Sequence, residues 1–309
     1  MEAGEVHVLL NPASGEGRAR KRWRELEPVA RALFPGLRVH ESLAAGDLGR
    51  IAAGLRDQNV LVLAAGGDGT SHEVLNGLLD DGPAAATMGW IPIGSGNDLA
   101  RTMGVPRRGT GALTGYRNYR TVAIDVGRLE YRDADGRVRS VWFGNSFTLG
   151  VSADVLEIVV REGKRLGGPL SYLLGALRAM ARHRPIEARF TIDGASADPG
   201  PCRLISVTNG PTFGAGMRIA PAAKVDDGHL NLLWLSRTSR LGMLGVFPKI
   251  YWGGHLGHPA VTSRPVTRLE IETDGPHGFE TDGELGFGYP PFRIVVAPRG
   301  LRAARFGAP

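Results

Sequence analysis

The stretch VLAAGGDGTSHEVLNGL, which runs from Val62 to Leu78, decides the fold class. It begins with a short apolar run, typical of a strand that is buried on both faces of a sheet. Three glycines around Asp68 come next, and a helical pattern follows at once from Thr70 to Leu79. A glycine-rich loop at a helix start can bind an anion through its backbone N–H groups. The stretch therefore predicts an α/β sheet with an anion site at this loop.

The same alternation of strands and helices covers the N-terminal part of the chain. Strands are expected at Val6–Leu10, Leu37–Ser42, Val60–Ala64 and Thr87–Ile93. Helices are expected at Glu16–Leu33, Asp47–Arg56, Thr70–Leu79 and from Asn97 to Met103. This order is typical of a mostly parallel, doubly wound sheet. We therefore expect an α/β doubly wound nucleotide-binding domain over residues 1–120.

The pattern changes near Arg120, where strands separated by short turns become dominant. Strands are expected at Thr121–Leu129, Val138–Thr148, Ile186–Asp193, Arg203–Val207, His229–Leu235, Val266–Thr273 and Phe292–Ala297. Helical patterns are fewer and lie at Val151–Arg161, Pro169–Arg182 and Leu241–Trp252. This predicts a second, β-rich sandwich domain over residues 121–309, the last of which could return to the first domain.

Composition describes an ordinary folded protein with a basic surface. The chain has 309 residues, a net charge of +6 and a pI near 9.8. Such a balance favours an anionic partner, which could be nucleic acid, a nucleotide or a membrane, although an arginine-rich composition explains it equally well. Cys202 is the single cysteine, which excludes an intrachain disulfide and fits the cytoplasm. No signal-peptide pattern and no apolar run near the roughly 18 residues of a membrane span occurs.

Two further small-residue loops follow expected strands, at Asn11–Gly15 and Gly94–Asp98. One such loop is more often a plain turn, but three at equivalent strand ends favour a phosphate site. Asp68 could reach a Mg²⁺ ion that arrives with a polyphosphate, and Thr70 and Ser95 could donate hydroxyls to phosphate oxygens. Neither a P-loop nor a dinucleotide-binding GxGxxG motif is present after the first strand.

Two acidic clusters stand in the C-terminal half. Asp226 and Asp227 precede a glycine, and Glu280, Asp282 and Glu284 stand just before the last expected strand. Each cluster could be a solvated turn. A carboxylate that faced the phosphate loops would instead supply the base for phosphoryl transfer to a hydroxyl.

Taken together, the motifs resemble the diacylglycerol kinase catalytic family, and soluble bacterial lipid kinases in particular. The matching motifs are Asn11-Pro-Ala-Ser-Gly15, Gly66-Gly-Asp-Gly-Thr70, Pro92-Ile-Gly-Ser-Gly-Asn-Asp-Leu-Ala-Arg101, Gly214-Ala-Gly-Met217, Asp227-Gly228 and Asp282-Gly-Glu284. Gly-Gly-Asp-Gly also occurs in NAD kinases and phosphofructokinases, whereas the Gly-Ser-Gly-Asn-Asp-Leu-Ala stretch indicates lipid kinases.

The resemblance implies an ATP site in the cleft between a nucleotide-binding domain and a β-sandwich domain. The expected nucleotide-binding residues are those of the three loops and the flanking positions: Asn11, Ser14, Gly15, Ser42, Gly66, Gly67, Asp68, Gly69, Thr70, Ser71, His72, Ser95, Asn97 and Asp98. By similarity, Mg²⁺ would be held by the Asp227 side chain and by the carbonyls of Lys224 and His229. The base would be Glu284 or, as a close second choice, Asp282.

We therefore expect an ATP- and Mg²⁺-dependent lipid kinase that acts on diacylglycerol. The alternatives are a kinase of a sphingosine-like lipid, another glycerolipid or NAD, and a non-catalytic nucleotide- or nucleic-acid-binding regulator. The expected partner is a lipid substrate at an anionic membrane surface, approached peripherally from the cytoplasm, with no nucleic acid and with a homodimer allowed. Basic segments at Arg161–Pro185 and around Trp23 could touch the lipid, although solvated helix faces explain them as well.

Overall fold

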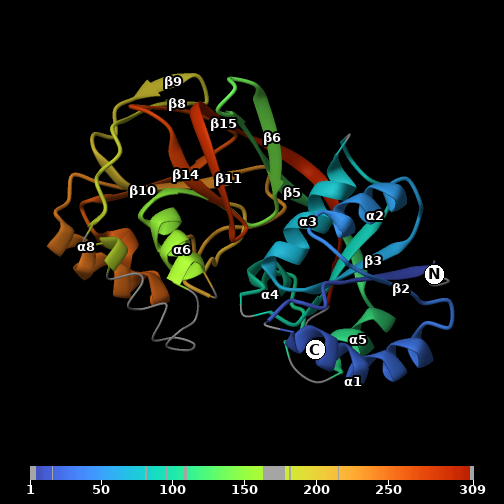
Figure 1. The fold of residues 1–309 in the computed structure, drawn as a ribbon. Helices are drawn as coiled ribbons and strands as arrows, with labels where there is room; N and C mark the ends of the chain where they lie inside the picture. Colours follow the sequence, from blue (N-terminus) through green and yellow to red (C-terminus); the bar gives the residue numbers. More distant parts are fainter. Residues whose placement is uncertain are drawn as a thin grey trace. The chain divides into compact units, whose positions relative to one another are not determined.

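The computed structural model describes residues 5–15, 17–80, 82–94, 96–107, 110–162, 178–180, 182–214 and 216–306 (Figure 1). The chain forms two compact units. The first unit comprises Met1–Val126, Val225–Asp227 and Ala297–Pro309, and the second comprises Gly127–Lys224 and Gly228–Val296. Within the described ranges, none of the helices combines the length and apolarity that a membrane span requires.

A parallel sheet forms the centre of the first unit. Its elements in chain order are β1 (Val6–Leu10), α1 (Arg18–Leu33), β2 (Arg38–Glu41), α2 (Asp47–Leu55), β3 (Leu61–Gly66), α3 (Asp68–Leu79), β4 (Thr87–Pro92), α4 (Asp98–Thr102), α5 (Gly111–Thr114) and η1 (Gly115–Arg117). The strands lie in the order β2-β1-β3-β4, and all these pairs are parallel. The end of β15 (Glu284–Arg305) joins the sheet beside β4, where Ala303 is paired with Met88. The expected doubly wound α/β arrangement is confirmed.

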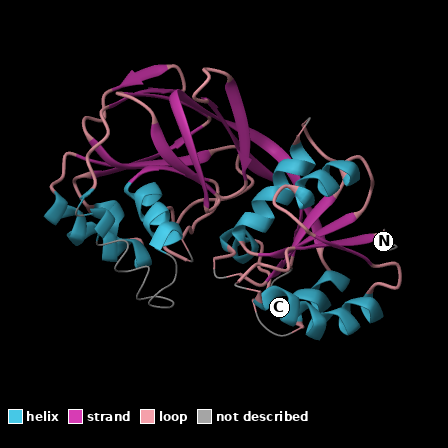
Figure 2. Ribbon diagram, in the orientation of Figure 1, coloured by secondary structure: helices cyan, strands magenta, loops and turns pink. Residues whose placement is uncertain are grey.

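Helices cover both faces of this sheet (Figure 2). One face buries the apolar stripe of α1, which includes Trp23 and Leu26, against Val8 and Leu63 of the sheet. Helices α2 and α3 pack together and bury Leu48 and the other apolar residues of their inner surfaces. Trp23 is 3% exposed. Its indole therefore belongs to the core, whereas the basic residues around it face solvent. Contact of this basic segment with a membrane stays a prediction.

Tyr116 completes the hydrogen bonding of the central strand β4. The backbone N–H of Trp90 donates to the Tyr116 hydroxyl oxygen at 2.5 Å, and that hydroxyl donates to the Trp90 carbonyl at 2.8 Å. Burial raises the pKa of the Tyr116 phenol, which keeps it protonated and able to donate. The side chain thus does at Trp90 what a neighbouring strand would do elsewhere in the sheet.

The second unit is built from antiparallel strands. Its elements are β5 (Arg120–Arg132, which begins in the first unit), β6 (Val138–Phe143), β7 (Ser146–Gly150), α6 (Val151–Glu162), β8 (Ala188–Ile192), β9 (Ala195–Ala197), β10 (Cys202–Thr208), β11 (Leu230–Ser236), α8 (Arg240–Val246), η2 (Phe247–Trp252), η3 (Gly254–Gly257), β12 (Val261–Val266), β13 (Arg268–Thr273), β14 (His277–Thr281) and the first part of β15. One set of strands runs β12-β11-β10-β7-β14-β15, and β15 also pairs with β13 and β5. Phe143, Phe147, Phe190, Phe279 and Phe292 fill the core between them. This β-sandwich-like unit confirms the second part of the expected fold.

Two expected strands are interrupted in the structure. The run Val138–Thr148 divides into β6 and β7, because the chain turns at Gly144 and Asn145 to bind a carboxylate from the β14–β15 turn. The run Val266–Thr273 likewise breaks at Thr267, which donates to the Asp193 side chain. The expected helix Pro169–Arg182 falls largely outside the described residues.

Candidate active site

The glycine-rich loops of the first unit meet at one edge of its sheet. They follow β1, β3 and β4, which are adjacent parallel strands, so their carboxyl ends share an edge. A Cβ placed on Gly67 would lie 3.4 Å from Ser14 Oγ and 3.5 Å from Gly94 Cα. The Gly94 N–H donates to the Gly66 carbonyl at 3.0 Å. The structure thus brings together the three loops that the sequence marked, while Ser95 lies outside the described residues.

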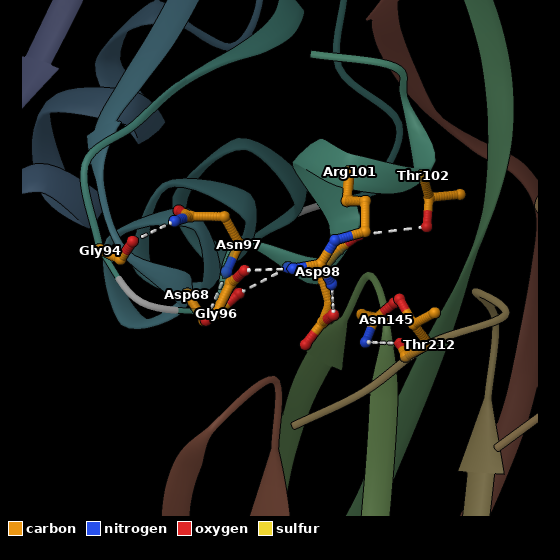
Figure 3. A network of polar contacts seen from close by, with 9 residues as sticks. All are labelled: Asp68, Gly94, Gly96, Asn97, Asp98, Arg101, Thr102, Asn145 and Thr212. Carbon is orange, nitrogen blue, oxygen red and sulfur yellow. Dashed lines mark hydrogen bonds and ion pairs between the residues drawn. The ribbon is translucent and has the colours of Figure 1, made fainter. Parts of the chain in front are cut away.

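Asp68 ties two of these loops together (Figure 3). Its Oδ2 accepts the Asn97 N–H at 2.8 Å and its Oδ1 accepts the Asp98 N–H at 3.1 Å, at the start of α4. Gly96 lies so close to this carboxylate that a Cβ there would collide with it. The sequence suggested Asp68 as a group that could reach Mg²⁺. The structure shows a carboxylate that holds the β4 loop in place through backbone N–H groups.

Arg101 brings a cation to the same loop. Its guanidinium forms an ion pair with Asp98, and its Nη2 donates to the Gly96 carbonyl at 3.3 Å. Asn97 stands in a left-handed conformation, and its side-chain amide donates to the Gly94 carbonyl at 2.7 Å. Arg101 ends the motif that begins at Pro92, but the motif alone gave it no role. A basic residue in the last turn of a helix can nevertheless be expected to bond to carbonyls or carboxylates nearby.

The other expected nucleotide-binding residues have defined places at this edge. The Asn11 side chain accepts the Ala13 N–H at 3.1 Å and shapes the first loop, where Gly15 is left-handed with φ 62°. Ser42 follows β2, and its N–H donates to the Leu10 carbonyl at 3.0 Å. The remaining members of the set lie at the start of α3, at Gly69, Thr70, Ser71 and His72. Thr70 is buried against Gly66. The Ser71 hydroxyl donates to the Gly67 carbonyl at 3.2 Å, so this hydroxyl bonds to the loop itself.

The surroundings of the loops suit a phosphate group. Helix α3 begins at Asp68 without a side-chain cap, which leaves the positive end of a twelve-residue helix at the loop. A Cβ on Gly94 would strike the Gly67 Cα, so only glycine fits and the backbone stays accessible to a ligand. An open pocket of about 720 Å³ lies beside Gly94, and Arg18 and Arg107 line it. Its size is in the range of small-molecule sites, and its charge suits the phosphates of ATP.

The acidic turn between β14 and β15 lies in the second unit. Asp282 and Gly283 both have positive φ and form the two-residue hairpin turn, after which Glu284 is paired with Thr281. The Asp282 carboxylate accepts N–H groups from Gly144 at 2.7 Å, Asn145 at 2.8 Å and Ser146 at 2.9 Å. Glu284 is exposed to solvent. The two expected bases thus differ: Asp282 anchors backbone, and Glu284 faces outward.

The expected Mg²⁺ residues lie on an exposed segment from Lys224 to His229 that precedes β11. Lys224, Asp227 and His229 are all solvent-exposed, and Gly228 has φ 80°. One carboxylate and two backbone carbonyls are hard oxygen donors of the kind Mg²⁺ prefers. A group of three or more His, Cys, Asp or Glu side chains suited to a metal does not occur in the described part of the chain. The Mg²⁺ site therefore stays a prediction that rests on the chemistry of these donors.

Glu280 is a buried carboxylate for which sequence reasoning gave no role. It accepts the Thr148 hydroxyl at 3.2 Å and the Ser152 hydroxyl at 3.0 Å, and it is 8% exposed. A second buried link, the Asn145 side-chain amide donating to the Thr212 carbonyl at 2.9 Å, fixes the other side of the β6–β7 turn (Figure 3).

Two family models match the chain in succession. The model described as "Diacylglycerol kinase catalytic domain" matches residues 5–129, and "YegS C-terminal NAD kinase beta sandwich-like domain" matches residues 145–305. Together they account for the α/β unit and the β-sandwich-like unit.

Curated relatives match over nearly the whole chain. A protein named diacylglycerol kinase from Mycobacterium tuberculosis (strain H37Rv) is 29% identical and covers 98% of this chain and 96% of its own length. A diacylglycerol kinase from Bacillus subtilis (strain 168) is 28% identical, with 91% and 90% covered.

Solved structures share the fold. A diacylglycerol kinase from Bacillus anthracis str. Sterne superposes with a TM-score of 0.78 at 22% identity and covers 99% of this chain and 98% of its own. Yeast NADH kinase superposes with a TM-score of 0.52 at 8% identity, covering 99% and 84%. At these identities the likeness speaks for the fold alone.

The fold, the gathered loops and these matches define a lipid kinase, a phosphotransferase whose acceptor is an alcohol. The chain belongs to the diacylglycerol kinase catalytic family, as its motifs indicated. Membership in a kinase family implies ATP as phosphoryl donor, and it sets aside the alternative of a non-catalytic regulator.

Proposed function

We propose that this lipid kinase depends on ATP and Mg²⁺ and transfers the γ-phosphoryl group to the hydroxyl of diacylglycerol. The observation that carries the proposal is the meeting of three glycine-rich loops at one sheet edge, with Asp68 joining the loops after β3 and β4. The names of the Mycobacterium tuberculosis and Bacillus subtilis relatives support diacylglycerol as acceptor.

The first unit binds the nucleotide phosphates in this mechanism. Backbone N–H groups at the start of α3 donate to phosphate oxygens, and the absence of side chains on Gly67 and Gly94 permits the close approach. Arg18 and Arg107 supply positive charge from the adjoining pocket. These donors stabilise the charge that develops on the phosphoryl oxygens during transfer.

Glu284 acts as the general base. Its carboxylate accepts the proton of the lipid hydroxyl while that oxygen forms its bond to the γ-phosphorus. The bond between the γ-phosphorus and the bridging oxygen breaks, and ADP leaves with that oxygen. Asp282 positions the β14–β15 turn through its three backbone N–H donors.

Mg²⁺ would be held by the Asp227 carboxylate and by the backbone carbonyls of Lys224 and His229. When bound, the ion supplies positive charge and order to this turn. The neighbouring Asp226 pairs with Arg305 at 3.6 Å, which holds the turn to the end of β15 in the first unit.

A substrate panel tests the acceptor. The purified chain is incubated with radiolabelled ATP, Mg²⁺ and, in separate reactions, diacylglycerol, monoacylglycerol, sphingosine and NAD. Phosphorylation of diacylglycerol in preference to the others is expected. Preference for sphingosine, another glycerolipid or NAD would replace the proposed acceptor, and lack of turnover with all of them would overturn the proposed reaction.

A pair of glycine variants tests the phosphate loops. Gly94→Ala is expected to abolish ATP binding, because the new Cβ would strike the Gly67 Cα. Gly54→Ala is the matched control, since nothing lies within 4 Å of a Cβ at that position. Binding of ATP by calorimetry, with thermal melting to confirm folding, separates the two. Normal ATP affinity in folded Gly94→Ala would place the nucleotide elsewhere.

A further inference from the structure

An apolar face on the second unit has no partner within the described residues. It is formed by helix α8 and the turns η2 and η3, the orange helical segment labelled α8 in Figure 1. Its members, here called the α8–η3 face, are Leu241, Leu244, Tyr251, Trp252 and Leu256. Leu241 is 79% exposed, Trp252 63% and Tyr251 53%. Large apolar side chains that are this exposed on one short segment indicate an interaction surface.

The segment beneath this face is firmly attached. Met243, Val246 and Ile250 point inward and pack with Leu233 and Leu235 of β11. Further anchors are polar: the buried His255 ring approaches the Ile219 carbonyl at 3.0 Å, and the Arg218 N–H donates to the Ile250 carbonyl at 3.0 Å. Because these inner contacts fix the segment to the unit, its outer apolar side chains are held in their exposed positions.

The charged residues of this segment are all basic. Arg237, Arg240 and Lys249 are exposed on the same segment. No Asp or Glu occurs between Asp227 and Glu270. Leucines with Trp and Tyr, bordered by cations and without acidic residues, are the composition of a segment that lies in the interface of an anionic bilayer.

We propose that the α8–η3 face docks the kinase on an anionic lipid bilayer. This inference rests on the proposed function, because a diacylglycerol acceptor resides in the bilayer. Trp252, Tyr251 and the leucines enter the headgroup region, while Arg240 and Lys249 contact lipid phosphates. A second copy of the chain fits less well, because a two-fold contact would bring the cationic border of one face against that of the other.

Vesicle co-sedimentation of the full chain tests the proposal with three variants. The probes are phosphatidylcholine vesicles with and without phosphatidylglycerol. Arg240→Gln/Lys249→Gln should weaken binding to the anionic vesicles by about fivefold per charge, as about 1 kcal/mol for each cation implies. Leu241→Ser/Trp252→Ala should weaken binding to both kinds of vesicle. Phe287→Ala is the matched control, an aromatic residue of the same unit that is 60% exposed, and it should bind like wild type.

Tryptophan fluorescence gives an independent readout. Trp252 is the exposed member of the five tryptophans, since Trp23 and Trp90 are buried and Trp142 and Trp234 are partly buried. Bromine-labelled lipid should quench the emission of wild type, and Trp252→Phe should lose most of that quenching. Wild-type vesicle binding that survives both double variants overturns the proposal. A second outcome would also overturn it: the wild type fails to bind vesicles but forms a dimer in solution, and Leu241→Ser/Trp252→Ala converts that dimer to a monomer.

The test separates the docking face from the reaction. Activity is measured in parallel on short-chain diacylglycerol dispersed in detergent micelles, which requires no bilayer. If the proposed reaction is correct but the proposed docking face is not, the protein phosphorylates micellar diacylglycerol and the variants bind vesicles like wild type. If the reaction is wrong, turnover is lacking while the variants still alter vesicle binding.

Discussion

The carboxylate of Asp282 accepts the backbone N–H of Asn145 at 2.8 Å, and it accepts those of Gly144 and Ser146 as well. The turn between β14 and β15 therefore fixes the turn between β6 and β7. Hydrogen bonds of this kind occupy both carboxylate oxygens with donors. Sequence spacing left Asp282 and Glu284 as near equals for the role of base. The proposal that Glu284 is the base leaves Asp282 the role of positioning this turn.

Glu284→Gln should lower kcat by about 10²- to 10⁴-fold, the usual contribution of a general base. The KM for ATP should stay nearly constant, because the carboxylate acts on the acceptor. Its thermal midpoint should also stay near that of wild type, since the side chain is exposed. Steady-state kinetics and thermal melting measure all three quantities.

Asp282→Asn is the companion variant, and it should lower the thermal midpoint. One acceptor oxygen becomes an amide nitrogen that faces backbone N–H donors, which leaves buried donors unpaired at about 1–3 kcal/mol. If Asp282→Asn lowers kcat by about 10²- to 10⁴-fold while Glu284→Gln keeps its turnover, Asp282 is the base and the assignment is swapped. Loss of less than about tenfold in both variants would place the base elsewhere.

Asp68→Ala should remove nearly all turnover and also destabilise the protein. Sequence alone predicts that this variant melts like wild type, because Asp68 then has only a role toward Mg²⁺ and phosphate. The structure changes that expectation, since the Asn97 and Asp98 N–H groups lose their acceptor and the β4 loop loses its attachment. A fall in the free energy of unfolding of about 1–3 kcal/mol by urea titration is expected. Unchanged stability would favour the role read from sequence.

Removal of divalent cations tests the Asp227 turn. A ligand that binds only the folded state raises its stability, so EDTA should lower the melting temperature of wild type purified with Mg²⁺. Asp227→Ala should melt at the same temperature with and without EDTA. Equal shifts in the two proteins would show that this turn holds no metal ion.

Much of the fold could be predicted from local patterns. Buried apolar runs marked β1, β3 and β4, and the glycine-rich loops marked the edge where they end. These patterns suffice for two reasons. A parallel strand that is buried on both faces consists almost entirely of hydrophobic residues, and few residues other than glycine fit where two backbones approach closely.

Contacts between residues distant in sequence could not be predicted. Asp282 binds a turn that lies 137 positions away at Asn145, and it breaks the strand that the pattern of Val138–Thr148 predicts. Tyr116 bonds to the backbone of Trp90 across 26 positions. Neither hydrophobic periodicity nor composition can predict such contacts, because each contact depends on how the completed sheet brings the two residues together.

His7 and His40 should make the stability of the first unit depend on pH. His7 Nδ1 lies 3.0 Å from His40 Nε2, and the two rings are stacked on neighbouring strands. Burial is the largest cause that lowers the pKa of both imidazoles, with Arg38 acting in the same direction and Glu5 opposing it. In the unfolded chain both histidines titrate near a pKa of about 6.5.

The sign of the effect follows from this difference. Below a pH of about 6.5 the unfolded chain binds protons that the folded pair still excludes, so the free energy of unfolding falls as the pH drops. The decline ends once the pH reaches the lowered pKa of the folded pair. Above the unfolded pKa the full stability is present.

Urea titrations between about pH 8 and pH 5 check this prediction, because the unperturbed histidine titrates in that interval. His40→Gln should reduce the loss of stability on acidification, since one of the two titrating rings is gone and its neighbour no longer faces a second imidazole. His277→Gln is the control, a histidine of the second unit paired with Asp274 at 3.2 Å, and it should keep the wild-type pH dependence. If the free energy of unfolding of His40→Gln falls with pH as steeply as that of wild type, the buried pair is not the source of the pH dependence. Other groups must then take up protons when the chain unfolds.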